Sequence, residues 1–166
     1  MGKKLSRGLL ALYIMTLIWI VLFKLTFNIS KIINYRHRSL NLIPFAAPSR
    51  VHGRINYEEI ILNCLFFIPL GLLLNVNFKK AGFLPKLAFI VIFSVSAELI
   101  QYIFAIGATD ITDVITNTAG GIIGLKLYDI KNKYIKTEKL DKIIIYVGSI
   151  LLLLFFSIHV THWVRR

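Results

Sequence analysis

A single carboxylate, Glu98, lies inside a segment that is otherwise almost entirely apolar, and this placement constrains the fold more than any other feature. The segment runs from Leu84 to Phe104 and is long enough to cross a bilayer, because about 20 helical residues span a hydrocarbon core of roughly 30 Å. A carboxylate near the middle of such a helix costs about 2.5–3.5 kcal/mol. Glu98 therefore needs a partner, a proton or water, and is either part of a functional site or a residue that joins helices.

The composition indicates an integral membrane protein. The chain is 57% hydrophobic and has a mean hydropathy of +0.72, both high for a soluble domain. Its net charge of +12 comes from 20 Lys and Arg against 8 Asp and Glu. Basic residues collect in the cytoplasmic loops of membrane proteins, and no recognition motif accompanies them here, so we expect no nucleic-acid partner. The single cysteine, Cys64, excludes an internal disulfide.

The apolar pattern predicts one all-α membrane domain over residues 1–166, a bundle of about five transmembrane helices. The expected spans are about 8–27, 60–76, 84–105, 112–128 and 143–163. With the N-terminus in the cytoplasm and the C-terminus outside, twelve Lys and Arg lie on the inner side and seven on the outer side, which favours this orientation. The first outer loop is then long and basic, and Lys31, Arg36 and Arg38 form a basic outer surface on it.

Polar side chains recur on one face of three of these spans, at helical steps of three and four. At 1.5 Å per residue, Asn63 and Asn117 lie about 6 Å below the outer boundary and Glu98 about 10 Å below it. Three helices would thus deliver acids and amides to one level, which predicts a polar cavity that opens outward. The candidate binding residues are Glu59, Asn63, Glu98, Gln101, Asp110, Asp113 and Asn117.

Simpler structural roles exist for some of these residues. Asp110 and Asp113 could cap the helix that follows them, since carboxylates accept hydrogen bonds from first-turn amides. Gly120 and Gly124 are four residues apart, a spacing that allows close helix packing. His159 and His162 are three residues apart but lie in an interfacial belt, so we expect no metal site and no cofactor.

Several short motifs carry a family resemblance. They are Asn41-Leu-Ile-Pro-Phe45, Asn63 followed by Phe67-Ile-Pro-Leu-Gly71, Ser96-Ala-Glu98-Leu-Ile-Gln101, and Asp110-Ile-Thr-Asp113 leading to Asn117 and Gly120-Gly121. In this order and spacing the chain resembles the VanZ-like family. The resemblance implies a multi-pass plasma-membrane protein of a Gram-positive bacterium that lowers susceptibility to teicoplanin and related lipoglycopeptides. No catalytic residue is carried over from the resemblance.

Three hypotheses for function remain. The first is a binding module whose cavity and basic loop engage membrane lipids and an acylated glycopeptide or lipid-linked cell-wall precursor. The second is a membrane enzyme that modifies a lipid or envelope polymer with Glu98 and the Asp110/Asp113 pair as acid, base or metal ligands. A transporter is the third, although five short spans make a poor conduit unless the protein oligomerises.

Overall fold

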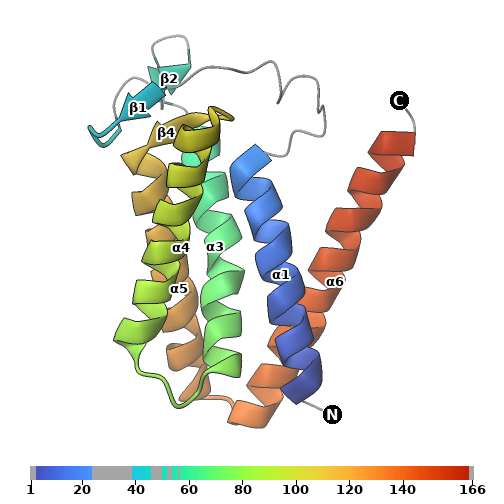
Figure 1. The fold of residues 1–166 in the computed structure, drawn as a ribbon. Helices are drawn as coiled ribbons and strands as arrows, with labels where there is room; N and C mark the ends of the chain where they lie inside the picture. Colours follow the sequence, from blue (N-terminus) through green and yellow to red (C-terminus); the bar gives the residue numbers. More distant parts are fainter. Residues whose placement is uncertain (1–2, 24–38, 46–49, 52–53, 56, 165–166) are drawn as a thin grey trace.

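The computed structural model describes residues 3–23, 39–45, 50–51, 54–55 and 57–164, and these form helices with a few short strands (Figure 1). Lys31, Arg36 and Arg38, the predicted basic surface, lie outside the described residues. The helices are α1 (Lys3–Phe23), α3 (Tyr57–Asn77), α4 (Phe83–Phe104), α5 (Ile111–Asn132) and α6 (Thr137–Val164), and the strands are β1 (Ser39–Asn41), β2 (Arg50–Val51), β3 (Arg54–Ile55) and β4 (Ala108–Asp110).

The helices confirm the predicted helical class, with two corrections. Four described helices are long and apolar enough to cross a membrane, namely α1, α3, α4 and residues 137–158 of α6. The predicted span 112–128 forms α5 but is not among them, because its Asp, Asn, Thr and Gly residues lower its hydropathy. These residues are buried against other helices, so α5 does not need a fully apolar surface. The second correction is the presence of strands, which the sequence pattern did not predict.

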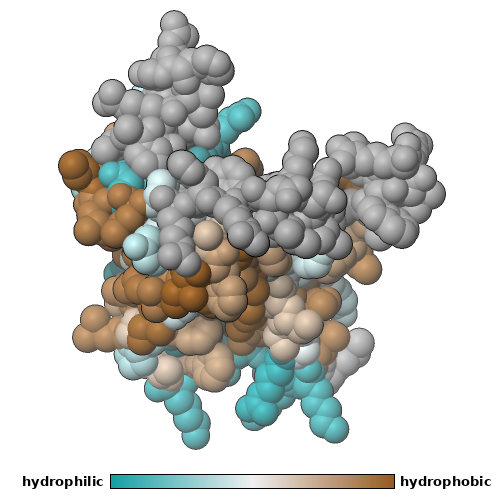
Figure 2. Space-filling view, turned by 45° about the horizontal axis from the view of Figure 1, so that its top comes forward, coloured by the Kyte–Doolittle hydropathy of each residue, from teal (hydrophilic) through white to brown (hydrophobic). Residues whose placement is uncertain are grey.

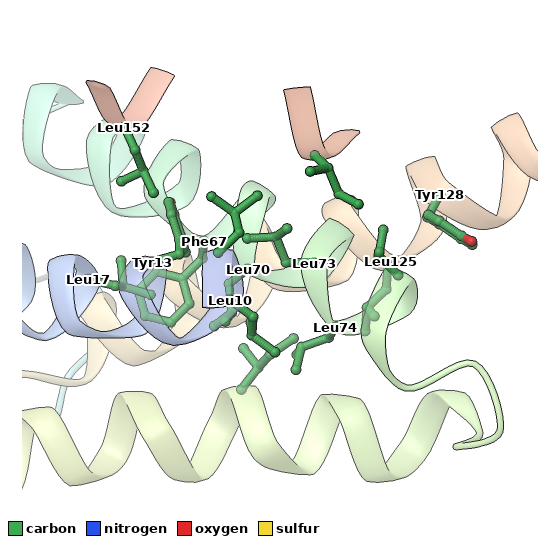
Figure 3. Packing of buried hydrophobic residues seen from close by; sticks show 14 of the residues in the cluster. Leu10, Tyr13, Leu17, Phe67, Leu70, Leu73, Leu74, Leu125, Tyr128 and Leu152 are labelled. Carbon is green, nitrogen blue, oxygen red and sulfur yellow. The ribbon is translucent and has the colours of Figure 1, made fainter. Parts of the chain in front are cut away.

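Helix α3 forms the centre of the bundle and makes its most extensive contacts with α5 and then with α1. Its leucines Leu70, Leu73 and Leu74 are buried among Leu17 of α1 and Leu125 of α5 (Figure 3). Burial of large apolar side chains between protein helices gives close van der Waals packing, which holds helices together where surrounding lipid is equally apolar.

Glycines allow α3 and α5 to approach each other closely, as their spacing predicted. A Cβ atom added at Gly120 would overlap the backbone carbonyl oxygen of Cys64, and one at Gly124 would overlap that of Ile68. On the α3 side, a Cβ at Gly71 would overlap the carbonyl oxygen of Gly121. Backbone atoms cannot move aside as a flexible side chain can, so these positions require glycine.

The outer surface of the bundle is apolar around its middle. Helices α4 and α6 present large exposed side chains there, including Ile92, Leu99, Leu153 and Leu154. Figure 2 shows hydrophobic side chains across the middle of the visible face and hydrophilic ones at its lower end. This distribution fits a protein whose middle band contacts lipid tails.

The two ends of the bundle differ in the helices and strands that meet there. At one end, here called the β end, strands β1 and β4 cross the ends of α4 and α5 (Figure 1). At the other, the charged end, α1 begins, α3 ends and α6 begins. The start of α1 and the end of α6 therefore lie at opposite ends of the bundle. The orientation with the N-terminus inside remains a prediction.

A buried lysine joins α4 to α3 towards the charged end. Lys86 is only 8% exposed, and its Nζ donates to Oδ1 of Asn75 at 2.6 Å. Nδ2 of Asn75 donates in turn to the carbonyl oxygen of Leu125 at 3.0 Å and to Oδ1 of Asp129 at 3.3 Å. Side chains from three helices thus satisfy one another, and the buried members Lys86 and Asn75 have partners within the protein.

Candidate functional site

The site is a group of buried polar residues at the β end, and Asp110 is its central member. Asp110 is the N-cap of α5, and its Oδ1 accepts the Thr112 N–H at 2.9 Å. The same Oδ1 accepts a hydrogen bond from Nδ2 of Asn41 in β1 at 3.0 Å. The capping role considered for Asp110 is therefore real, and its carboxylate also ties a distant segment to the start of α5.

Strand β1 reaches α5 by pairing with β4, the strand directly before that helix. The two strands are parallel, with Ser39 opposite Ala108 and Asn41 opposite Asp110. This pairing brings Asn41 next to the start of α5. Beyond β1, the Phe45 N–H donates to Oγ1 of Thr112 at 2.9 Å. Phe45 has a φ of 57°, a left-handed conformation that costs energy in a residue with a side chain.

Glu98 is buried and faces the junction of β4 and α5. Its exposed fraction is 4%, and its Oε2 accepts the Asp110 N–H at 2.9 Å. Oγ1 of Thr109 donates to the backbone carbonyl oxygen of Glu98 at 3.1 Å. The carboxylate in the middle of the apolar run therefore has a protein partner, which offsets part of the cost of its burial.

Two amides complete the connection between three helices. Nδ2 of Asn63 in α3 donates to Oδ1 of Asp113 in α5 at 2.8 Å. Nδ2 of Asn117, one helical turn further along α5, donates to Oγ of Ser94 in α4 at 2.9 Å. The Oδ1 atom of Asn117 is buried and has no hydrogen-bond partner within the described part of the chain.

These hydrogen-bonded residues are referred to below as the polar cluster. It comprises Asn41, Asn63, Ser94, Glu98, Asp110, Thr112, Asp113 and Asn117. Five of the seven residues predicted from sequence belong to it, namely Asn63, Glu98, Asp110, Asp113 and Asn117.

The two remaining predicted residues have other surroundings. Nε2 of Gln101 donates to the carbonyl oxygen of Val21 in α1 at 3.0 Å, so Gln101 joins α4 to α1 instead. Glu59 lies half-buried in the first turn of α3, four residues before Asn63.

The predicted set omits Asn41, Thr112 and Ser94. For two of them the sequence contains a feature that indicates a buried polar position. Asn41 opens a segment too apolar to be a free loop, and Ser94 lies one helical turn before Glu98. Thr112 carries no such signal, because a threonine near a helix start is common as a capping residue.

The chemistry of the polar cluster is that of a hydrogen-bonding site rich in acceptors. Its three carboxylates belong to Glu98, Asp110 and Asp113, and its three amides belong to Asn41, Asn63 and Asn117. Oδ1 of Asn117 has no hydrogen-bond partner among the described residues. Over the described residues, no three His, Cys, Asp or Glu side chains gather closely enough to hold a metal ion. The arrangement suits recognition of hydroxyl, amide or ammonium groups, all of which donate hydrogen bonds.

Comparisons with known proteins agree on one family. Residues 10–132 match the VanZ/LLP1 family model. The chain is 60% identical over 162 residues to Protein VanZ of Enterococcus faecium, a match that covers 98% of this chain and 96% of that protein. No solved structure shows a significant match. The family model covers most of the chain and the identity extends over nearly its full length, so the chain belongs to the VanZ/LLP1 family.

Proposed function

We propose that this protein lowers bacterial susceptibility to teicoplanin and related lipoglycopeptides, acting in the plasma membrane of a Gram-positive host. In this proposal the N-terminus is cytoplasmic, the β end faces the cell exterior, and the polar cluster engages an acylated or lipid-linked ligand. Membership of the VanZ/LLP1 family and the near full-length similarity to Protein VanZ of Enterococcus faecium support the role in resistance.

The observation that carries the binding site is the convergence of polar groups from three helices at one end of the bundle. Glu98, Asp113 and Asn117 are each at most 6% exposed, although burial of polar groups at this depth is costly. Such residues within membrane helices commonly mark ligand sites. The unpaired Oδ1 of Asn117 gives a donor group of the ligand a partner within the polar cluster.

Apolar side chains beside the polar cluster supply a place for an acyl chain. Leu42 and Ile43 follow Asn41 directly and are 68% and 69% exposed. Leu40 and Phe45 of the same segment are also exposed. A ligand with a polar head and an acyl tail could contact both surfaces. Teicoplanin has such a tail and vancomycin does not, so this arrangement would distinguish between the two drugs.

The substitution Glu98→Gln tests the proposal. Its amide oxygen can still accept the Asp110 N–H, so we expect a folded protein that has lost one titratable group. The expected result is a teicoplanin inhibitory concentration close to that of cells lacking the protein, with vancomycin unaffected. Glu58→Gln is the matched control, since Glu58 is an exposed acid in the first turn of α3. Unchanged teicoplanin protection by Glu98→Gln at equal expression would leave Glu98 with a structural role only.

Burial of Glu98 and Asp110 at one junction also favours a second function, a membrane enzyme that uses these carboxylates with Asp113 in acid–base chemistry. Expression would then change the lipid or cell-wall composition, and Asp113→Asn would abolish that change. An unaltered envelope composition in expressing cells would exclude this function and leave the binding module.

A further inference from the structure

A groove with a volume of about 920 Å³ opens at the charged end of the bundle, where the start of α1, the end of α3 and the start of α6 meet. The helix ends that line it lie opposite the end of the bundle where β1 and β4 lie (Figure 1), so the groove is separate from the polar cluster and plays no part in the function proposed above. Much of its wall is apolar and includes Val76, Phe78 and Ile145. Small-molecule pockets have volumes of roughly 300–1,000 Å³. The groove is near the upper end of that range and is large enough for a lipid headgroup.

The rim of the groove is strongly basic. Five cations line it, namely Lys3, Arg7, Lys79, Lys80 and Lys142, against the two carboxylates Glu138 and Asp141. Asp141 is already engaged, since it pairs with Lys79 and its Oδ1 accepts the Tyr128 hydroxyl hydrogen bond at 2.7 Å. The positive charge of Arg7, Lys80 and Lys142 therefore exceeds what the acids of the groove neutralise, which favours an anionic occupant.

An asparagine fixes the inner wall of the groove and leaves an acceptor unused. Nδ2 of Asn77 donates to the carbonyl oxygen of Ser6 in α1 at 3.3 Å and to that of Leu73 at 2.9 Å, which holds the start of α1 against the end of α3. Because both contacts are with carbonyl oxygens, the amide orientation is determined, and Oδ1 is left buried without a partner among the described residues. A hydroxyl group in the groove could donate to this oxygen.

We propose that this groove binds a phospholipid whose headgroup is both anionic and hydroxylated, the chemistry of phosphatidylglycerol. The phosphate would lie among Arg7, Lys80 and Lys142, a headgroup hydroxyl would approach Asn77, and an acyl chain would follow the apolar wall. Basic pockets between transmembrane helices bind anionic headgroups in this way, and the groove lies at the helix ends, where headgroups are found.

Purified full-length protein in neutral detergent provides the test, with the midpoint of thermal unfolding as the measurement. Phosphatidylglycerol should raise the midpoint more than phosphatidylcholine with the same acyl chains, because only the former carries net charge. Phosphatidylmethanol, which is anionic but has no headgroup hydroxyl, should give an intermediate shift. Inorganic phosphate and glycerol phosphate should give little, since neither can cover the apolar wall.

The double substitution Arg7→Gln/Lys142→Gln should abolish the preference for phosphatidylglycerol. The matched control is Lys131→Gln/Lys139→Gln, which removes two exposed charges near the same end that do not line the groove. An equal loss in the control would show a diffuse surface effect and overturn the proposal. If Arg7→Gln/Lys142→Gln retained the preference for phosphatidylglycerol, the proposal would be overturned as well. If inorganic phosphate raised the unfolding midpoint as much as phosphatidylglycerol, the site would take the free anion and no lipid.

Discussion

Nδ2 of Asn63 donates to Oδ1 of Asp113 at 2.8 Å, and this hydrogen bond joins two helices whose backbones are already in close contact through glycines. The pair lies at the β end, while the glycine contacts continue along α3 and α5 towards the charged end. Polar and steric determinants therefore act on the same helix pair. Their separate contributions can be measured.

Removing either partner of this hydrogen bond should destabilise the bundle. We expect Asn63→Ala and Asp113→Ala each to lower the free energy of unfolding by about 1–3 kcal/mol, because each leaves a buried or half-buried polar group without this partner. The double variant should cost less than the sum of the two, with a coupling of about 1 kcal/mol, as for residues in contact. Unfolding in mixed micelles with increasing denaturing detergent measures all four proteins. Strict additivity would contradict a direct interaction.

The close contacts at the glycines predict a larger loss of stability. Gly124→Ala places a Cβ against the backbone carbonyl of Ile68, so α5 must move away from α3, at a cost of about 3 kcal/mol or more. The control is Gly8→Ala in α1, where a Cβ meets no atom within 4 Å. Alanine favours a helix over glycine by up to about 1 kcal/mol, so the control should be neutral or stabilising. Yields and thermal unfolding of the two variants distinguish these outcomes, and similar behaviour would be inconsistent with the close helix approach.

Lys86 should matter for stability through its buried hydrogen bond. Lys86→Met keeps the length of the side chain but leaves Oδ1 of Asn75 without its donor, and we expect a loss of about 1–3 kcal/mol. Lys133→Met is the control, because Lys133 is exposed at the same end of the bundle and does not line the groove. Thermal unfolding midpoints of both variants provide the measurement. A larger loss for Lys133→Met would contradict the arrangement.

The orientation predicted from charge can be tested with single cysteines in a Cys64→Ala background. Phe104→Cys lies at the β end and Tyr134→Cys between α5 and α6, and both positions are well exposed at 68% and 83%. In intact cells a membrane-impermeant maleimide should label the first and not the second. In permeabilised cells the maleimide should label both cysteines. The reverse pattern in intact cells would place the polar cluster on the cytoplasmic side.

Local sequence patterns predicted the features that depend on one or two neighbouring helices. Helical steps of three and four placed Asn63, Asp113 and Asn117 on inward faces, and the spacing of Gly120 and Gly124 indicated close packing. The surroundings of Gln101 could not be deduced in this way. Periodicity shows which residues share a face, but the choice of α1 as the neighbour of that face depends on the packing of the whole bundle.

Pairing between segments far apart in the chain could not be predicted from the sequence either. The parallel ladder between β1 and β4 consists of two three-residue strands, too short for an alternating pattern to be recognised. Likewise, the polar composition of residues 112–128 indicates a helix buried against neighbours, but it does not identify the helices that surround the polar residues of α5. Both features arise from contacts between distant segments, on which a local window carries no information.

The hydrogen bond between Asn41 and Asp110 joins residues that are 69 positions apart in the chain. During synthesis Asn41 leaves the ribosome well before its partner exists, and α3 and α4 must enter the bilayer in the interval. This contact cannot form before Asp110 has been made, so closure of the β end follows the synthesis of α3 and α4. Truncated nascent chains that stop before residue 110 would carry four of the eight polar-cluster residues, Asn41, Asn63, Ser94 and Glu98, into the membrane without their α5 partners.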